Sequence, residues 1–300
     1  MIGELAALGA AICWTVSAVL YKEALLKANP LPANIVRCVY TSIVLVVCLA
    51  IIGKFGVLMD LSLHAVILTS VSGIVGLGFG DTLYMVSLKL MGIARAVPIT
   101  CSYPLFNLLL AVVLAGEAVT LYVILGTVAI VLGIWLLSRE EKETGTSEPQ
   151  KKRLIRGVAS ALATAIFWSV SIAMINMAIN LPETSSLDNA LAINTIRVSA
   201  AAFFLLASTP ITDRKCSFLK IHKKRLIALT SGGIVALAVG WFLLTFSFIH
   251  TPQSQAVPIS STTPLFATVS GIVFLHEKVA AREVVGSIMI VIGIFLIFTV

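Results

Sequence analysis

Charged residues are scarce in this chain: only 12% of its 300 residues are Asp, Glu, Lys or Arg, whereas 59% are hydrophobic. Soluble globular domains do not reach this balance, nor a mean hydropathy of +1.05. The formal net charge of +7 does not indicate a nucleic-acid partner, because the basic residues lie in short clusters between long apolar runs. A lipid bilayer is therefore the expected partner.

The sequence also lacks the motifs of enzymes and metal-binding proteins. It has no CxxC, HExxH or GxSxG motif and no glycine-rich phosphate loop followed by lysine, and its 4 histidines are scattered. The 5 cysteines show no paired spacing, so we expect reduced packing residues and not a disulfide framework. We therefore predict a protein that is not an enzyme and that needs no metal or cofactor.

Ten apolar segments have about 20 residues or more, the length that crosses a hydrocarbon core of ~30 Å. Polar residues 139–153 (REEKETGTSEPQKKR) separate the fifth segment from the sixth and form the natural linker. The first segment lacks the basic start and the cleavage site of a signal peptide, so we interpret it as a retained helix. The ten segments are 4–26, 32–53, 65–88, 95–116, 119–138, 155–179, 188–209, 226–249, 254–275 and 279–299.

Residues 96–106 (AVPITCSYPLF) recur as residues 256–266 (AVPISSTTPLF), with seven of eleven positions identical. The same offset of 160 positions pairs glycines along both halves, so the chain contains a duplication. Each unit has five helices, an odd number, so the second unit must enter the bilayer from the opposite side. The sequence therefore predicts an all-α integral membrane protein with ten transmembrane helices in two inverted five-helix repeats, residues 1–138 and 154–300. This architecture is typical of secondary transporters.

The basic residues are distributed unevenly between the two sides of the predicted bundle. Of the 21 Lys and Arg, eighteen lie in connections 1–2, 3–4, 5–6, 7–8 and 9–10 or at the adjacent helix ends. The opposite side holds Lys54 alone, and Arg37 and Arg197 lie within helices. The positive-inside rule places the rich side in the cytoplasm, which leaves both termini outside.

Further features match between the two units. They are Trp14 and Trp168 in the first and sixth helices, Arg37 and Arg197 in the second and seventh, prolines in the fourth and ninth, and GE (116–117) with HE (276–277) after them. With this set the chain resembles the drug/metabolite transporter superfamily, specifically its ten-helix proteins made of two EamA repeats.

The resemblance implies a secondary transporter of the plasma membrane that exports or exchanges a small metabolite, amino acid or amphipathic compound by alternating access. A non-transporting membrane scaffold or a lipid-handling protein is the alternative. Members of the superfamily usually have both termini in the cytoplasm, so the side of the termini stays open. The small four-helix relatives carry an essential Glu in the first helix, whereas that helix here reads ICWTVS (12–17).

Four prolines interrupt apolar helices at matching positions of the two units. In a bilayer, a carbonyl that loses its donor to proline must be covered by protein or line a water-filled cavity. We expect Pro98 and Pro258 to begin helices, where proline fits well. Pro104 and Pro264 lie deeper, and we expect them to kink a segment that lines a cavity. The small polar residues between the prolines are candidate substrate contacts: Thr100, Tyr103, Ser261 and Thr262.

Apart from the basic residues near the helix ends, Arg37 and Arg197 are the only basic residues within the predicted spans. We interpret them as contacts for a carboxylate or phosphate of the substrate, one at each mouth of the cavity. Extension of each side chain to the nearby membrane surface is the alternative. Trp14 and Trp168 lie in mid-helix, where a buried indole N–H needs a partner, so they either line the cavity or pack the core.

Asp81 is the one acid deep within a predicted helix. Acids inside a membrane are costly and usually functional, so Asp81 is a candidate proton carrier. Because Gly76, Gly78 and Gly80 precede it, binding to backbone at a close helix crossing is the alternative. Glu117 follows the fourth helix, and a carboxylate is favourable at a helix start, so we expect it to cap the next helix.

Gly126 and Gly133 are seven residues apart and share one helix face, as do Gly286 and Gly293. Small faces of this kind let membrane helices approach closely. We therefore expect the fifth and tenth helices to pack together within one chain, which favours a monomer and leaves a dimer as the alternative. The other partners that we expect are a small-molecule substrate and the bilayer.

Overall fold

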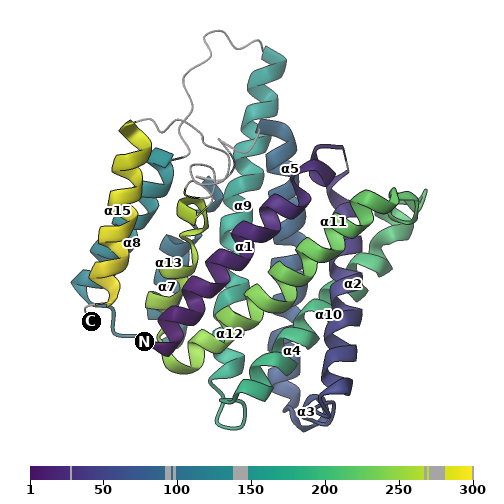
Figure 1. The fold of residues 1–300 in the computed structure, drawn as a ribbon, viewed down its shortest axis with the longest axis horizontal. Helices are drawn as coiled ribbons and strands as arrows, with labels where there is room; N and C mark the ends of the chain where they lie inside the picture. The colour runs from purple at the N-terminus through teal and green to yellow at the C-terminus, as the bar shows by residue number, and fades with distance from the viewer. Residues whose placement is uncertain are drawn as a thin grey trace.

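The computed structural model describes residues 1–27, 29–91, 96, 99–137, 148–266, 269 and 281–298 (Figure 1). All regular elements in this part of the chain are helices, which confirms the all-α class. The first half contains α1 (Ile2–Lys27), α2 (Pro30–Ile51), α3 (Val57–Asp60), α4 (Leu63–Ser72), η1 (Gly73–Gly80), α5 (Asp81–Met91), α7 (Tyr103–Ala115) and α8 (Leu121–Leu137). The second half contains α9 (Glu148–Ile179), α10 (Leu187–Thr212), η2 (Ser217–Lys220), α11 (Lys223–Gly233), η3 (Ile234–Gly240), α12 (Trp241–His250), α13 (Gln253–Ser260) and α15 (Ala281–Phe298).

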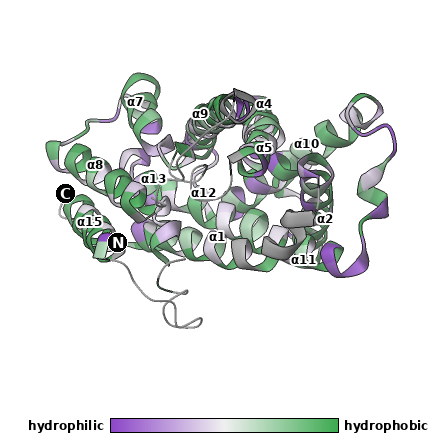
Figure 2. Ribbon diagram, turned by 90° about the horizontal axis from the view of Figure 1, so that it is seen from above, coloured by the Kyte–Doolittle hydropathy of each residue, from purple (hydrophilic) through white to green (hydrophobic). Residues whose placement is uncertain are grey.

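Several of these helices have the length and composition of membrane spans. The 5 stretches that qualify within the described residues are Pro30–Ile51, Leu63–Leu90, Lys152–Ile179, Leu187–Thr212 and Lys223–His250. Shorter apolar helices cover Ile2–Ser17, Tyr103–Leu114, Leu121–Leu136 and Val284–Phe298. Apolar residues extend along most helices, and hydrophilic residues are most concentrated in the connections (Figure 2). The chain is therefore a multi-pass helical membrane protein.

Two of the long helices each contain a short π-helical segment, in which the helix is wider, at matching positions of the two units. The backbone N–H of Asp81 bonds to the carbonyl of Gly76, and that of Trp241 bonds to the carbonyl of Ala236. Both bonds span five residues, so η1 and η3 are π-helical segments, a feature frequent at functional sites. Asp81 and Trp241, which the offset of 160 pairs, each follow the end of a widened segment.

The proline-flanked helices are interrupted by turns. One turn lies at residues 101–102, and Pro104 follows it in the first turn of α7. The second lies at residues 261–262, with Pro264 after it. Pro258 lies inside α13, so the expectation that it begins a helix is wrong. The cavity-lining role of Pro104 and Pro264 stays a prediction, and Pro98 lies outside the described residues.

The two units pack crosswise through glycines. Gly73, at the start of η1, lies against the backbone of Arg197 on α10. Its repeat mate Gly233, at the end of α11, lies against Arg37 on α2, where an added Cβ would be 2.7 Å from the Arg37 Cγ. The widened helix of each unit thus contacts the arginine-bearing helix of the other unit. Glycine makes this close approach possible because it has no side chain.

Helices α8 and α15 pack side by side, which confirms the expected pairing of the fifth and tenth helices (Figure 1). A Cβ on Gly126 would lie 2.7 Å from the carbonyl oxygen of Gly293, and one on Gly133 would lie 2.6 Å from that of Gly286. The residue order reverses between the two contacts, so α8 and α15 run antiparallel.

Candidate functional site

A buried ion pair joins Arg37 on α2 to Asp81, the residue after η1. The Arg37 Nη2 donates to Asp81 Oδ2, and the residues are each 6% exposed. Trp168 on α9 donates its indole N–H to the other carboxylate oxygen of Asp81 over 2.8 Å. The carboxylate is thus held by one residue from each unit. We call Arg37, Asp81 and Trp168 the acidic cluster.

Asn34 positions the arginine of the acidic cluster. Its Oδ1 accepts from Arg37 Nη2 at 3.0 Å, and its Nδ2 donates to the Leu77 carbonyl at 2.8 Å. The repeat mate Asn194 donates in the same way to the Leu237 carbonyl at 2.8 Å. In a π-helical segment the backbone bonds are displaced, and the two asparagines satisfy carbonyls there that would otherwise be buried without a donor.

A second cluster surrounds Arg197, which is 0% exposed. Its Nε donates to Ser72 Oγ at 3.2 Å, and its Nη2 donates to Ser171 Oγ at 3.1 Å. The guanidinium carbon lies 3.7 Å from the ring centre of Trp241, a cation–π contact. The rings of Trp14 and Trp241 pack edge-to-face with their centres 5.2 Å apart. We call Arg197, Trp241 and Trp14 the aromatic cluster.

The two clusters occupy equivalent positions but differ in charge. Both arginines point into the bundle, so the alternative in which they extend to the membrane surface is not observed. Asp81 binds the side chains of Arg37 and Trp168, so the geometry differs from the backbone contact that was its alternative role. Where the first unit places Asp81 against its arginine, the second unit places the neutral ring of Trp241.

The polar residues of the interrupted helices divide into two groups. The rings of Tyr103 and Trp168 pack edge-to-face with their centres 5.8 Å apart, so Tyr103 adjoins the acidic cluster. The Tyr103 hydroxyl lies 3.5 Å from Ser260 Oγ. The Ser261 and Thr262 hydroxyls, in the turn after α13, donate to carbonyls of α13, each at 2.7 Å. Thr100 is buried beside the turn at residues 101–102. The substrate-binding role of all four residues stays a prediction.

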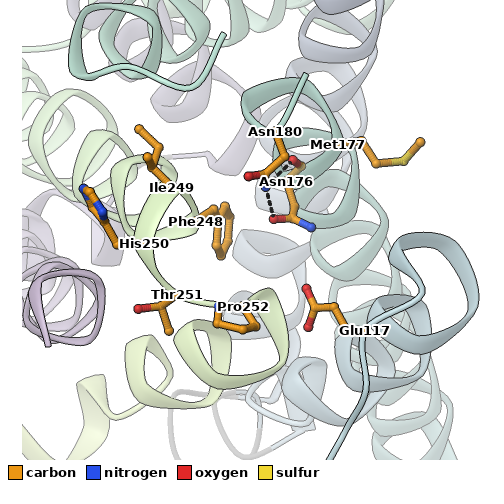
Figure 3. Close-up of a pocket in the computed structure, with 9 residues that line it drawn as sticks. All are labelled: Glu117, Asn176, Met177, Asn180, Phe248, Ile249, His250, Thr251 and Pro252. Atoms are coloured by element: carbon orange, nitrogen blue, oxygen red, sulfur yellow. Dashed lines mark hydrogen bonds between the residues drawn. The ribbon is translucent and has the colours of Figure 1, made fainter. Parts of the chain in front are cut away.

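A cavity of about 450 Å³ lies where α9 and α12 end (Figure 3). Its polar lining includes Glu117, Asn176 and Asn180, and Asn180 Nδ2 donates to Asn176 Oδ1 at 2.9 Å. Phe248 and Pro252 add apolar surface between these polar groups (Figure 3). The cavity therefore combines carboxylate and amide groups with an aromatic ring.

Glu117 caps a helix of the other unit. Its two carboxylate oxygens accept from the backbone N–H groups of Gln253 and Ser254, each at 2.9 Å, at the start of α13. The expectation that Glu117 caps the helix that follows it is therefore wrong. The contact satisfies two free donors and places a negative charge at the positive end of the α13 dipole.

Glu117→Gln is expected to lower the free energy of unfolding by about 1 kcal/mol, because the amide loses the charge and one of the two acceptors. Thermal unfolding in detergent measures the change. Asp60→Asn, at an exposed position on α3, is the matched control and should leave the melting temperature unchanged. Equal melting temperatures for Glu117→Gln and wild type would rule out the capping role.

One family model matches this chain in two separate stretches. The model of the EamA-like transporter family matches residues 1–139 and 155–299. An "Uncharacterized transporter" of Archaeoglobus fulgidus is 26% identical over 304 residues, 99% of this chain and 98% of that protein. A "Putative sugar uptake protein" of Lactobacillus johnsonii is 24% identical over 218 residues, 71% of this chain and 70% of that protein.

A protein of known crystal structure has a similar fold, with a TM-score of 0.77 at 16% identity over 99% of this chain and 97% of the other. The family model covers nearly all of both units, together with the tryptophans, arginines and interrupted helices described above. This chain therefore belongs to the EamA-like transporter family of the drug/metabolite transporter superfamily.

Proposed function

We propose that the protein is a secondary transporter that moves a small metabolite, amino acid or amphipathic compound across the plasma membrane by alternating access, through export or exchange. The observation that carries this proposal is the pair of equivalent polar clusters buried inside a bundle of apolar helices. Charged side chains are costly at such positions and usually line the path of a solute or an ion.

The proposed architecture has ten spans in two inverted repeats, residues 1–138 and 154–300, joined by the linker 139–153. The antiparallel packing of α8 on α15 supports it, because equivalent helices of two inverted units must run in opposite directions. The crosswise contacts of Gly73 and Gly233 support it further, because a two-fold axis between the units generates such matched contacts.

Alternating access follows from this symmetry. If two similar units adopt two slightly different conformations, exchanging them between the units converts an inward-open state into an outward-open state. Both clusters lie at contacts between the units, since Trp168 reaches Asp81 and Trp14 reaches Trp241. Rearrangement of one unit against the other would therefore change both clusters together.

The orientation that we propose follows the positive-inside rule and places the linker in the cytoplasm. A reporter that is active only in the cytoplasm should be active when fused within residues 139–153. A reporter that is active only outside the cytoplasm should be silent at the same position. The reverse pattern would contradict this orientation and place both termini in the cytoplasm.

Transport is tested in liposomes that contain the purified protein. A panel of sugars, amino acids and organic anions is followed in both directions, because the Lactobacillus johnsonii relative is named for uptake. Each solute is measured with and without a pH gradient to separate proton-coupled accumulation from exchange. Flux of at least one solute above that of protein-free liposomes is expected, whereas a membrane scaffold would produce none.

A further inference from the structure

The two buried arginines occupy equivalent positions of the repeat, but within the described ranges only one of them is paired with a carboxylate. The charge of Arg37 is neutralised by Asp81. Arg197 has no such partner among the described residues: the groups it contacts are the hydroxyls of Ser72 and Ser171 and the ring of Trp241, all of which are neutral. The repeat position that would supply a carboxylate is occupied by that ring.

Arg197 is also short of one acceptor. Its Nη1 is fully buried and has no hydrogen-bond partner in the part of the chain that the structure describes. A guanidinium has five N–H donors in a fixed fork, and a buried donor without a partner is costly. Among the described residues, no carboxylate contacts Arg197 and one of its N–H donors has no acceptor, and an oxyanion supplies both a negative charge and an acceptor.

We propose that Arg197 binds a single anionic group, a carboxylate or a phosphate, of the transported molecule. This proposal rests on the transport function proposed above and specifies its substrate class. Arg37 stays paired with Asp81 and makes no such contact. The Ser72 and Ser171 hydroxyls adjoin the bound group, and the rings of Trp241 and Trp14 offer apolar surface to the rest of the molecule.

The cavity at the ends of α9 and α12 gives this site its proposed access. Ser171 precedes Asn176 on α9 by five residues, and Trp241 precedes Phe248 on α12 by seven. At 1.5 Å per residue, these separations are about 7.5 Å and about 10.5 Å along the two helices. The same two helices thus contribute to the arginine site and to the cavity lining. The Glu117 carboxylate in the cavity is already paired with the start of α13, which reduces its repulsion of an anion.

Binding is tested by the melting temperature of the purified protein in detergent, because a ligand of the folded state raises it. The probes are inorganic phosphate and lactate at constant ionic strength, with glycerol as the neutral control. A saturable rise is expected with at least one of the two anions and none with glycerol. Arg197→Gln should weaken that response tenfold or more, and Ser199→Ala, a nearby change on α10, should leave it at the wild-type value.

Trp241→Asp supplies the carboxylate that the second unit lacks. We expect this variant to fold, with the introduced carboxylate paired to Arg197 as Asp81 is paired to Arg37, and to lose the anion response. A wild-type response in Trp241→Asp or in Arg197→Gln would overturn the proposal, as would the absence of any response to both anions in the wild type.

Flux in liposomes without any anion response would remove the anion site and keep the transport function. An anion response that depends on Arg197, found without any flux, would keep the anion site and remove the transport function.

Discussion

Asp81→Asn is expected to destabilise the folded protein by about 3–5 kcal/mol, because it removes the carboxylate charge that is paired with the buried guanidinium of Arg37. The same change weakens the bond from the Trp168 indole, which loses a charged acceptor. Asp188→Asn is the matched control, because Asp188 forms an exposed ion pair with Lys54. Loss of an exposed pair should cost less than about 1 kcal/mol.

A double substitution separates the charge from the packing. Arg37→Met combined with Asp81→Leu removes both charges, and we expect it to recover much of the stability that Asp81→Asn loses. Chemical unfolding in detergent measures the single and double variants together. Equal losses for Asp81→Asn and Asp188→Asn would show that the buried pair contributes little.

Transport by Asp81→Asn tests the proposal that Asp81 carries a proton. Where the variant remains folded, it should lose accumulation driven by a pH gradient and retain exchange between equal pools of substrate. Accumulation at the wild-type level would restrict Asp81 to its structural pairing with Arg37.

Gly73→Ala is the second substitution with a large expected effect. Its Cβ would lie 2.9 Å from the carbonyl carbon of Arg197 and would overlap the carbonyl oxygen. Backbone cannot rotate away as a side chain can, so α10 must move. We expect a loss of about 3 kcal/mol, the upper part of the usual range for overpacking. Because Arg197 itself would shift, the anion response should weaken as well.

Two further glycines give the expected order. In Gly233→Ala the added Cβ would lie 2.7 Å from the Arg37 Cγ and 2.8 Å from the Thr41 Oγ1. Both are side-chain atoms, so the loss of stability should be smaller than that of Gly73→Ala. Gly56→Ala has no atom within 4 Å and should stay within about 0.5 kcal/mol of the wild type. Melting temperatures of the three variants measure the order, and a Gly73→Ala protein as stable as Gly56→Ala would refute the close packing.

The sequence predicted the helices and the duplication because both depend on patterns that the chain itself displays. An apolar run of sufficient length has few alternatives to a helix in a bilayer. The offset of 160 then paired equivalent residues from the second helix of each unit onward, including Asp81 and Trp241. The difference in charge between the two clusters was therefore present in the sequence before any contact was known.

The partners of the site residues could not be predicted in the same way. Asp81 lies 44 residues from Arg37 and 87 from Trp168, so only the packing of three helices brings them together. The π-helical segments were also hidden, because GIVGLGFG and IVALAVG have the composition of ordinary apolar helix. Ser72 and Ser171 gave no signal beyond being small and polar.

Glu117 and Pro258 show how distant contacts change a local expectation. Proximity along the chain suggested that Glu117 caps the helix that follows it. In the structure, the first N–H groups of α13 donate hydrogen bonds to the Glu117 carboxylate instead. That cap fixes the start of α13 at Gln253, which places Pro258 inside the helix.

Counterflow in liposomes tests the transport function most directly. Liposomes that contain the wild-type protein are loaded with an unlabelled mixture of small carboxylates and phosphate esters, and uptake of each labelled compound is followed from outside. We predict transient uptake of at least one compound above its equilibrium level, with little uptake in protein-free liposomes or with Arg197→Gln. Folded wild-type protein that exchanges none of these carboxylates and phosphate esters would contradict the account.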